Sequence, residues 1–384
     1  MKLSETAKCV ELSLTRELFN KANAYDDVVD FTLGDPDFPT PNYIKAAAHR
    51  AIDTNRTRYS ANAGLLELRK ILSKTIEKET GVKYSPDHEI IVTVGAMQAL
   101  YLALLCMIDR DDEVIIPAPY WINYDHMVKM CGGKSVIVDS FEKNDFIVSI
   151  DDIEKNISEK TTAIIINSPN NPTGTVYNKK TLEGICKLAK KYDFSIIWDE
   201  CYKTITYDEK FISILENKDI TDRLVVINSC SKRFAMTGWR IGYAAAPSCL
   251  IQNMTKLQEN IVACAPLPSQ YAAIAAFSDE NGESKILCEG YKKRRNLLVD
   301  GINNIQGLSC KMPKGTFYAF VNIKGTGLSD IDFAYKLLDK KHVAVVPGVT
   351  YGKCCEGFVR IAYTVNETLI KEGLRRIEEF VNEL

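Results

Sequence analysis

The sequence predicts an α/β fold, with a large part built on a mainly parallel central sheet that has helices on both faces, and a smaller α+β part. Through the middle of the 384-residue chain, short apolar runs alternate with amphipathic stretches of helical period. Strands that are buried on both faces read as continuous apolar runs, and strands that alternate with helices form parallel sheets. Nearer the C-terminus the pattern changes to a long charged helix and paired strands, which indicates the second layer.

The expected strands of the large sheet are short and rich in Ile, Val and Ala. They occupy residues 89–94, 113–117, 135–139, 162–167, 194–199, 224–228 and 240–246. A helix is expected at 96–108, where apolar residues crowd a short segment. Another is expected at 179–192, where Leu182, Ile185 and Leu188 recur at helical spacing.

A change of pattern marks the start of the smaller part. The polar loop at 278–284 ends the alternation of strands and helices, so we place a boundary near residue 285. Beyond it, strand patterns that alternate or contain Gly lie at 316–323 and 357–364. Paired strands of this kind predict a second, smaller layer that packs against the large sheet.

Charge and composition exclude several classes of function. The chain has 48 Lys and Arg against 50 Asp and Glu, a formal charge of −2, so no basic surface for nucleic acid is indicated. The longest apolar run, 96–108, is too short to span a bilayer, so we expect no membrane segment. The polar N-terminal sequence lacks the apolar core of a secretory signal, which predicts a cytoplasmic protein. Scattered cysteines without C-x-x-C and four isolated histidines predict no metal site.

Two partial nucleotide-binding patterns lack their partners. The G-K-S run at 133–135 copies the end of a P-loop, but Val128 stands where that loop needs its first glycine. The apolar strand that ends in Asp-Glu at 195–200 is similar to the magnesium-holding strand of an ATPase, which also needs the P-loop. An ATPase therefore stays open only as an alternative. No G-x-G-x-x-G follows a strand, and neither H-E-x-x-H nor G-x-S-x-G occurs.

The segment after the strand 224–228 carries the main chemical signal. Lys232 stands near the carboxyl end of that strand, where open α/β sheets bind their ligands. The hydroxyls of Ser229 and Ser231, with Arg240 eight positions after the lysine, can bind a phosphate. A lysine amine beside that phosphate can form a Schiff base with a carbonyl. A phosphorylated aldehyde meets both requirements, and pyridoxal 5'-phosphate is one.

Pyridoxal phosphate also needs an acid that keeps its ring nitrogen protonated. Asp199, at the end of the strand 194–199, is the candidate, although an exposed strand-end carboxylate is the alternative. Tyr202 follows three positions later and can hydrogen-bond the phenolic oxygen of the ring. Asn171 lies in an N-N-P-T-G run at a third strand end, and that run is also a competent turn by its local chemistry.

Taken together, these motifs resemble those of the pyridoxal-phosphate-dependent class I/II aminotransferases of the aspartate aminotransferase fold, fold type I. The chain contains N-N-P-T-G, D-E-x-Y, S-x-S-K and R-x-G in the family's order. The likeness extends from F-T-L-G-D-P-D-F-P-T-P at 31–41, through R-Y-S-x-x-x-G-L-x-E-L-R around Tyr59, to G-F-V-R-I-A-Y around Arg360. It implies an N-terminal segment of the small domain, a large cofactor-binding domain and a small C-terminal domain, at residues 1–44, 45–285 and 286–384.

The resemblance assigns catalytic roles by motif position. Lys232 would form the Schiff base with the cofactor and then move a proton between the substrate α-carbon and the cofactor. Asp199 would pair with the ring nitrogen, while Asn171 and Tyr202 would bind the phenolic oxygen. Trp121 would stack on the ring and contact the substrate.

The resemblance also implies a phosphate site and a substrate site. The phosphate ligands would be side chains and backbone N–H groups of Gly95, Ala96, Met97, Ser229, Ser231 and Arg240. The partner subunit's Tyr59 would reach the same phosphate, which implies a homodimer with active sites at the interface. Arg360 would clamp the substrate α-carboxylate, with the Gly34 backbone, Asn171 and Trp121 beside it.

We therefore expect an aminotransferase that moves an amino group between an L-amino acid, with aspartate favoured, and a 2-oxo acid by a ping-pong cycle. A carbon–sulfur lyase on the same fold is the nearest alternative, because it would use the same cofactor residues. A noncatalytic ligand sensor is a further alternative. Such regulators need a DNA-binding extension, and the family-like region begins too near the N-terminus to leave room for one.

Overall fold

The computed structural model describes residues 1–10, 12–278 and 282–384, and within them the largest feature is a seven-stranded sheet. In spatial order its strands are β2 (Ile90–Thr93), β8 (Gly242–Ala245), β7 (Leu224–Ser229), β6 (Ser195–Asp199), β5 (Thr161–Asn167), β3 (Glu113–Ala118) and β4 (Lys134–Asp139). Neighbours pair in parallel except at β8, which runs antiparallel to β2 and β7. The predicted α/β class with a mainly parallel sheet is confirmed.

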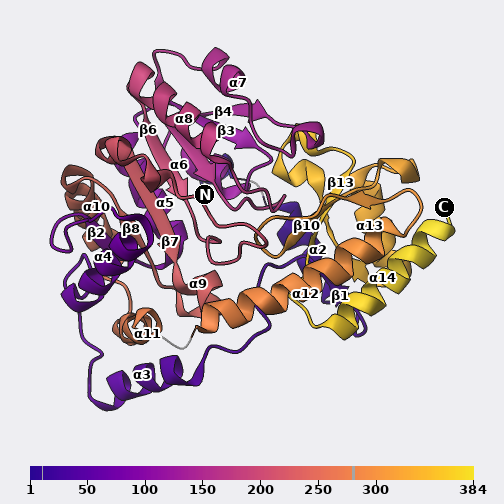
Figure 1. Cartoon of the computed structure of the whole chain (residues 1–384), viewed down its shortest axis with the longest axis horizontal. Helices are drawn as coiled ribbons and strands as arrows, with labels where there is room; N and C mark the ends of the chain where they lie inside the picture. The colour runs from indigo at the N-terminus through magenta and orange to yellow at the C-terminus, as the bar shows by residue number, and fades with distance from the viewer. Residues whose placement is uncertain (11, 279–281) are drawn as a thin grey trace.

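Helices cover both faces of this sheet (Figure 1). One face packs against α3 (Asn42–Asp53), α4 (Leu66–Thr80), α8 (Lys179–Tyr192) and α11 (Leu267–Phe277). The other face packs against α5 (Gly95–Met107), α6 (Asn123–Met130) and α10 (Ser248–Ile261). The shorter helices α7 (Ile150–Lys155) and α9 (Cys230–Arg233) lie in connections between strands.

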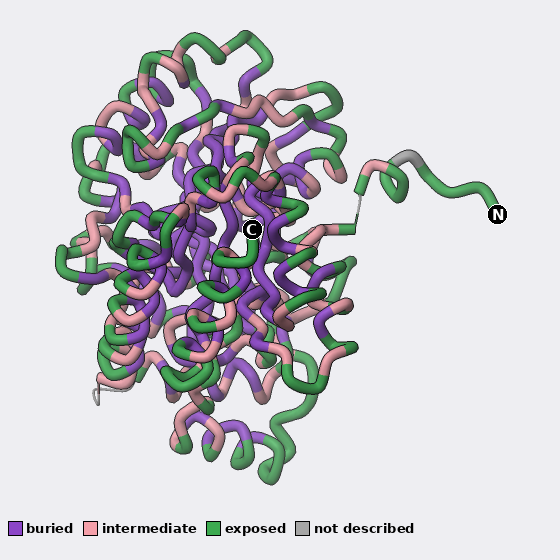
Figure 2. The backbone as a smooth tube through the Cα atoms, turned by 90° about the vertical axis from the view of Figure 1, so that its right-hand side faces the viewer, coloured by how far each residue is buried: buried purple, intermediate pink, exposed green. Residues whose placement is uncertain are grey.

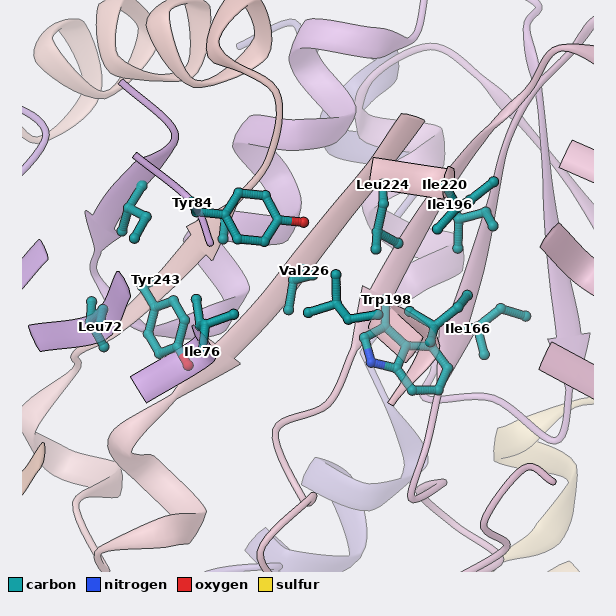
Figure 3. Packing of buried hydrophobic residues seen from close by; sticks show 14 of the residues in the cluster. Leu72, Ile76, Tyr84, Ile166, Ile196, Trp198, Ile220, Leu224, Val226 and Tyr243 are labelled. Atoms are coloured by element: carbon teal, nitrogen blue, oxygen red, sulfur yellow. The ribbon is translucent and has the colours of Figure 1, made fainter. Parts of the chain in front are cut away.

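The strands divide their side chains between the two apolar clusters, because successive residues of a strand point to opposite faces. Ile164 and Ile166 of β5 join the cluster on the α4 side, and Ile165 between them joins the cluster on the α5 side. Trp198 of β6 packs on the α4 side with Val226 of β7 (Figure 3). Burial of apolar surface on both faces explains why these runs are continuously apolar.

The smaller part contains a four-stranded antiparallel sheet. Its strands, in spatial order, are β12 (Val346–Pro347), β13 (Phe358–Ala362), β10 (Tyr318–Asn322) and β9 (Ser309–Cys310). Its helices are α2 (Leu14–Ala22), α12 (Glu283–Asn303), α13 (Asp330–Lys341) and α14 (Glu367–Asn382). Figure 1 shows this part on one side of the molecule and the seven-stranded sheet on the other.

The N-terminal segment is tied to the C-terminal part of the chain. Strand β1 (Val29–Asp30) pairs in parallel with β11 (Val343–Ala344). The short helix α1 (Glu5–Lys8) precedes it, and Figure 2 shows the first residues projecting from the body of the protein. Short 3₁₀ helices lie at η1 (Glu142–Asn144), η2 (Ile214–Glu216), η3 (Lys218–Arg223), η4 (Thr237–Trp239), η5 (Lys324–Thr326), η6 (Gly348–Tyr351) and η7 (Lys353–Cys355).

The predicted strand 240–246 is shorter in the structure, because Arg240 has a positive φ of 50° and β8 begins only at Gly242. Residues 279–281 of the polar loop placed before residue 285 lie outside the described residues, and the three-segment division of the chain stays a prediction. In the described part of the chain, no helix has the length and apolar character that a membrane crossing requires.

The two parts meet where the parallel strands end. Cys201 and Tyr202, which lie just beyond the end of β6, belong to the same apolar cluster as Phe317 and Val359 of the smaller part. The carboxyl end of β6 therefore faces the antiparallel strand pair β10–β13. Such an edge is where side chains from both parts can converge on one ligand.

We predict that position 242, at the start of β8, must be a glycine because the backbones of α5 and β7 lie against it. A Cβ there would lie 2.6 Å from the backbone nitrogen of Ala96 and 2.9 Å from the carbonyl oxygen of Asn228. Neither backbone group can move without shifting α5 or β7, so Gly242→Ala should lower the free energy of unfolding by about 1–3 kcal/mol. Urea unfolding measures this. Gly238→Ala is the control, because a Cβ there meets no atom within 4 Å, and equal losses in both variants would contradict the prediction.

Candidate active site

A cavity of about 270 Å³ lies at the carboxyl ends of β5, β6 and β7, where they face the smaller part. Most of the predicted site residues line it: Gly34, Ala96, Met97, Trp121, Asn171, Asp199, Tyr202, Ser229, Ser231, Lys232, Arg240 and Arg360. The position is the one at which α/β sheets bind small ligands. Residues that lie far apart in the sequence therefore share one concave site.

Lys232 enters the cavity from the short helix α9, which begins directly after β7. Its Nζ donates a hydrogen bond of 2.5 Å to the carbonyl oxygen of Gly34 and lies 5.5 Å from the centre of the Phe317 ring. Burial lowers the pKa of the Lys232 ammonium to about 8, and the positive charges of Arg240 and Arg360 act in the same direction. A lysine of this kind is a nucleophile and a proton acceptor near neutral pH.

Asp199 ends β6 with its carboxylate inside the cavity. The hydroxyl of Tyr124 donates to Oδ2 at 2.7 Å, and the backbone N–H of Cys201 donates to Oδ1 at 3.0 Å. Burial raises the pKa of Asp199, while these two hydrogen bonds oppose the rise. A buried carboxylate that is held in one orientation suits a cationic partner, such as a protonated ring nitrogen.

One end of the cavity is suited to bind an anion. Arg240 follows η4 with its NH1 donating to the carbonyl oxygen of Thr237 at 2.8 Å. Its guanidinium lies so close to the N-terminus of α5 that a Cβ at Gly95 would come within 2.4 Å of NH2. The first turn of α5 presents unpaired N–H groups and the positive end of the helix dipole. With the hydroxyls of Ser229 and Ser231, these donors match a phosphate dianion.

Arg360 provides a second, separate anion site from β13. Its side chain is buried, its NH1 donates to Oδ1 of Asn171 at 3.0 Å, and its NH2 donates to the carbonyl oxygen of Thr32. Its Nε has no hydrogen-bond partner among the described residues. The guanidinium lies 4.4 Å from the ring centre of Tyr318 and 5.2 Å from that of Tyr351. A rigid guanidinium with a free donor is suited to bind a planar carboxylate.

Tyr202 and Trp121 flank the space between these groups. The hydroxyls of Tyr202 and Tyr318 share a hydrogen bond of 3.1 Å. Trp121 packs edge to face against Tyr124, with ring centres 5.5 Å apart, and borders the cavity. The donor set therefore fits pyridoxal phosphate: an amine, a buried carboxylate, a phosphate cradle and polar groups for a ring oxygen.

Two predicted residues do not line the cavity. Gly95 contributes only through the closeness of the α5 backbone to Arg240. Tyr59 is 86% exposed and does not line this cavity, so its role in a neighbouring subunit stays a prediction. An exposed tyrosine of this kind is compatible with an action across an interface.

The sequence analysis missed several residues of the site. Tyr318 sits two positions from Phe320, which pairs with Arg360 in the β10–β13 register, so it shares the face of the arginine. A Cβ at Gly34 would lie 1.7 Å from the Tyr318 hydroxyl, so the position of this tyrosine leaves no room for a side chain at residue 34. Thr15, from α2, and Tyr124 also line the cavity. The strand period of 316–323 could have indicated Tyr318, but no spacing signal identifies Thr15.

Comparisons with known proteins agree with this geometry. A family model described as Aminotransferase class I and II matches residues 26–377. The aspartate aminotransferase of Pyrococcus abyssi is 40% identical over 386 residues, which cover 100% of this chain and 99% of the relative. The aromatic-amino-acid aminotransferase 2 of Thermococcus litoralis is 38% identical, with the same two shares of 100% and 99%. The solved structure of the Thermus thermophilus aspartate aminotransferase with maleate has a TM-score of 0.95 at 34% identity and full coverage of both chains, 100% each.

The lowered pKa of Lys232 predicts a distinct titration. A protonated amine does not react with an acylating reagent, so the acylation rate of Lys232 in the ligand-free protein should rise with pH through a midpoint near about 8. Mass mapping of the peptide that contains position 232 measures the rate at each pH. The phase should vanish in Lys232→Met. A midpoint at the ordinary lysine value of 10.5 would show that the amine is not desolvated.

Proposed function

The chain belongs to the class I and II aminotransferase family and is an aminotransferase, and on that premise we propose that it uses pyridoxal 5'-phosphate to move an amino group between an L-amino acid and a 2-oxo acid. One observation carries the proposal. The desolvated amine of Lys232 lies in one cavity with a buried carboxylate, an anion cradle and a buried guanidinium. No single group of this set is diagnostic, but the combination matches a phosphorylated aldehyde plus a carboxylate substrate.

The cofactor would be held at three places. Arg240, Ser229, Ser231 and the N-terminus of α5 would bind its phosphate. Asp199 would pair with its ring nitrogen, and the positive charge of that nitrogen would favour the ionised carboxylate. When bound, pyridoxal phosphate supplies an aldehyde that reacts with amines and a ring that withdraws electrons from the substrate α-carbon.

Lys232 performs two tasks in this proposal. Because its pKa is near about 8, a useful fraction of the side chain is uncharged at neutral pH and can attach to the aldehyde. Once a substrate amine has displaced it, the freed Nζ would accept the proton that leaves the substrate α-carbon and donate that proton to the cofactor. Burial of Nζ and the positive charges of Arg240 and Arg360 disfavour the charged form of the amine.

Arg360 determines where the substrate lies. Its free Nε and its fixed plane would bind the α-carboxylate, and the Asn171 side chain holds the guanidinium in that plane. Amino acids and 2-oxo acids share this carboxylate. One clamp therefore serves both half-reactions, which supports a ping-pong cycle in a single cavity.

The amino donor and the assembly belong to the same proposal. Aspartate is the first donor to test, because relatives at 40% and 37% identity are named aspartate aminotransferases, and an aromatic donor is the second. We further propose a homodimer in which the partner subunit's Tyr59 completes the phosphate cradle. A cytoplasmic location stays a prediction. A carbon–sulfur lyase would use the same residues, and pyruvate release from cystathionine without a 2-oxo acid would favour it.

Replacing Lys232 by alanine tests the proposal directly. The variant loses both the attachment point and the proton acceptor, so the turnover number for amino transfer from L-aspartate to 2-oxoglutarate should fall about a thousandfold or more. The assay contains added pyridoxal phosphate. Lys187→Ala, an exposed site on α8, is the control and should keep full activity. A Lys232→Ala protein with normal turnover would contradict the proposal, and ATP hydrolysis that survives in it would favour an ATPase.

Arg360→Lys should separate substrate binding from cofactor binding. An ammonium keeps the charge but loses the two-pronged geometry, and one charge-assisted hydrogen bond contributes about 1.5–3 kcal/mol. The KM for the amino donor should therefore rise about ten- to a hundredfold. The affinity for pyridoxal phosphate, measured by absorbance titration, should stay near that of the wild type. Unchanged KM values would rule out the carboxylate clamp.

A further inference from the structure

We propose that a set of paired charges outside the cavity positions the catalytic groups, and that it consists of Glu79, Glu200, Lys203 and Arg233. We call this set the rear network. It lies on the α4 side of the sheet, since Glu79 belongs to α4. The inference rests on the proposed function, because it concerns the groups that would hold the cofactor and move the proton.

Glu200 is the centre of the rear network. Its side chain is only 1% exposed and accepts three hydrogen bonds or ion pairs. Lys203 Nζ donates to Oε1 at 2.5 Å, Asn228 Nδ2 donates to Oε1 at 3.2 Å, and Trp198 Nε1 donates to Oε2 at 3.0 Å. The carboxylate therefore binds β6 through Trp198 and β7 through Asn228.

The network continues to α4 and α9. Lys203 Nζ forms a second ion pair with Glu79 Oε2 at 2.8 Å, and Arg233 NH1 contacts Glu79 Oε1 at 2.9 Å. Burial acts to lower the pKa of Lys203, but Glu200 and Glu79 raise it above its ordinary value. Lys203 therefore stays charged. Two carboxylates and two cations thus balance each other within the protein.

Each end of the rear network adjoins a residue of the cavity. Asp199 lines the cavity, and Glu200 follows it in the chain. Asn228 precedes Ser229 of the phosphate cradle, and Arg233 follows the reactive Lys232. At three points, therefore, a residue that lines the cavity is the chain neighbour of Glu200, of Arg233 or of Asn228, which is hydrogen-bonded to Glu200.

The two sites do not share lining residues. Glu79, Glu200 and Lys203 line a different surface cavity of about 400 Å³, whereas the cavity described above contains none of them. A direct contact with cofactor or substrate is therefore not their role. Buried ion pairs contribute little net stability compared with apolar packing, so their presence here is better explained by the orientation that they impose. The rear network would fix the distances between the carboxylate of Asp199, the hydroxyl of Ser229 and the amine of Lys232.

The test uses Glu200→Gln and Glu79→Gln. Glu200→Gln removes the central charge and leaves Lys203 and two N–H donors competing for one oxygen. Glu79→Gln alters a residue that is 30% exposed, so it keeps the test valid if the first variant does not fold. Both should weaken binding of pyridoxal phosphate to the cofactor-free protein, by about ten- to a hundredfold for Glu200→Gln, the range seen when outer-shell partners of metal ligands are removed. Glu79→Gln should change it in the same direction.

A kinetic split distinguishes positioning from general stability. The turnover number should fall about tenfold or more, because small displacements of reacting groups are costly, while the KM for the amino donor stays within about threefold since Arg360 is untouched. Arg295→Met is the matched control. It removes a guanidinium that is 4% exposed and ion-paired with Asp208. Neither residue lines the cavity, so the variant should lower the unfolding temperature without changing cofactor affinity.

The outcomes separate this inference from the function on which it rests. If both network variants lower only the unfolding temperature, as Arg295→Met does, the rear network is merely structural and the inference is wrong. If their cofactor affinity and turnover match the wild type, it is also wrong. A wild-type chain that binds no pyridoxal phosphate would overturn the proposed function and this inference together.

Discussion

The desolvation of one amine is the constraint on which the site depends. Lys232 lies at the end of a buried strand, with Arg240 and Arg360 nearby, and these conditions disfavour its charged form. The Nζ atom of Lys232 donates a hydrogen bond to the carbonyl oxygen of Gly34. A ligand with a carbonyl group would remove the cost of burying this charge, because the amine would then be bonded covalently to the ligand. The other residues of the cavity provide the anion-binding and polar groups that such a ligand requires.

The fold supplies the geometry by bringing separate parts together. Three parallel strands end at the same edge, so Asn171, Asp199 and Lys232 follow different strands yet face one space. The antiparallel strand pair β10–β13 of the smaller part adds Tyr318 and Arg360 to the same cavity. Two guanidinium groups thus line one cavity, each with its own set of neighbours. Different residues would therefore hold the phosphate of the proposed cofactor and the carboxylate of the proposed substrate.

Much of this arrangement was accessible from the sequence, for physical reasons. Short apolar runs that alternate with helical stretches predicted the strands. Asp199 and Lys232 were predicted as site residues because the carboxyl ends of parallel strands meet at one edge of a sheet. Local patterns could not reveal the antiparallel direction of β8, because the connection from β7, which contains α9 and η4, is long enough for either direction. Thr15 and Tyr318 also escaped, since their positions arise from packing between segments that are far apart in the chain. The rear network was invisible for the same reason: α4 and α9 meet only in the folded protein.

The central claim is that one amine, at position 232, binds the aldehyde of pyridoxal phosphate. Borohydride reduction of the cofactor-loaded protein, followed by mass analysis of its peptides, tests this most directly. The account predicts a single reduced pyridoxyl adduct on the peptide that contains Lys232, and none in Lys232→Ala. An adduct spread over surface lysines, or a protein that gains no adduct at all, would contradict it.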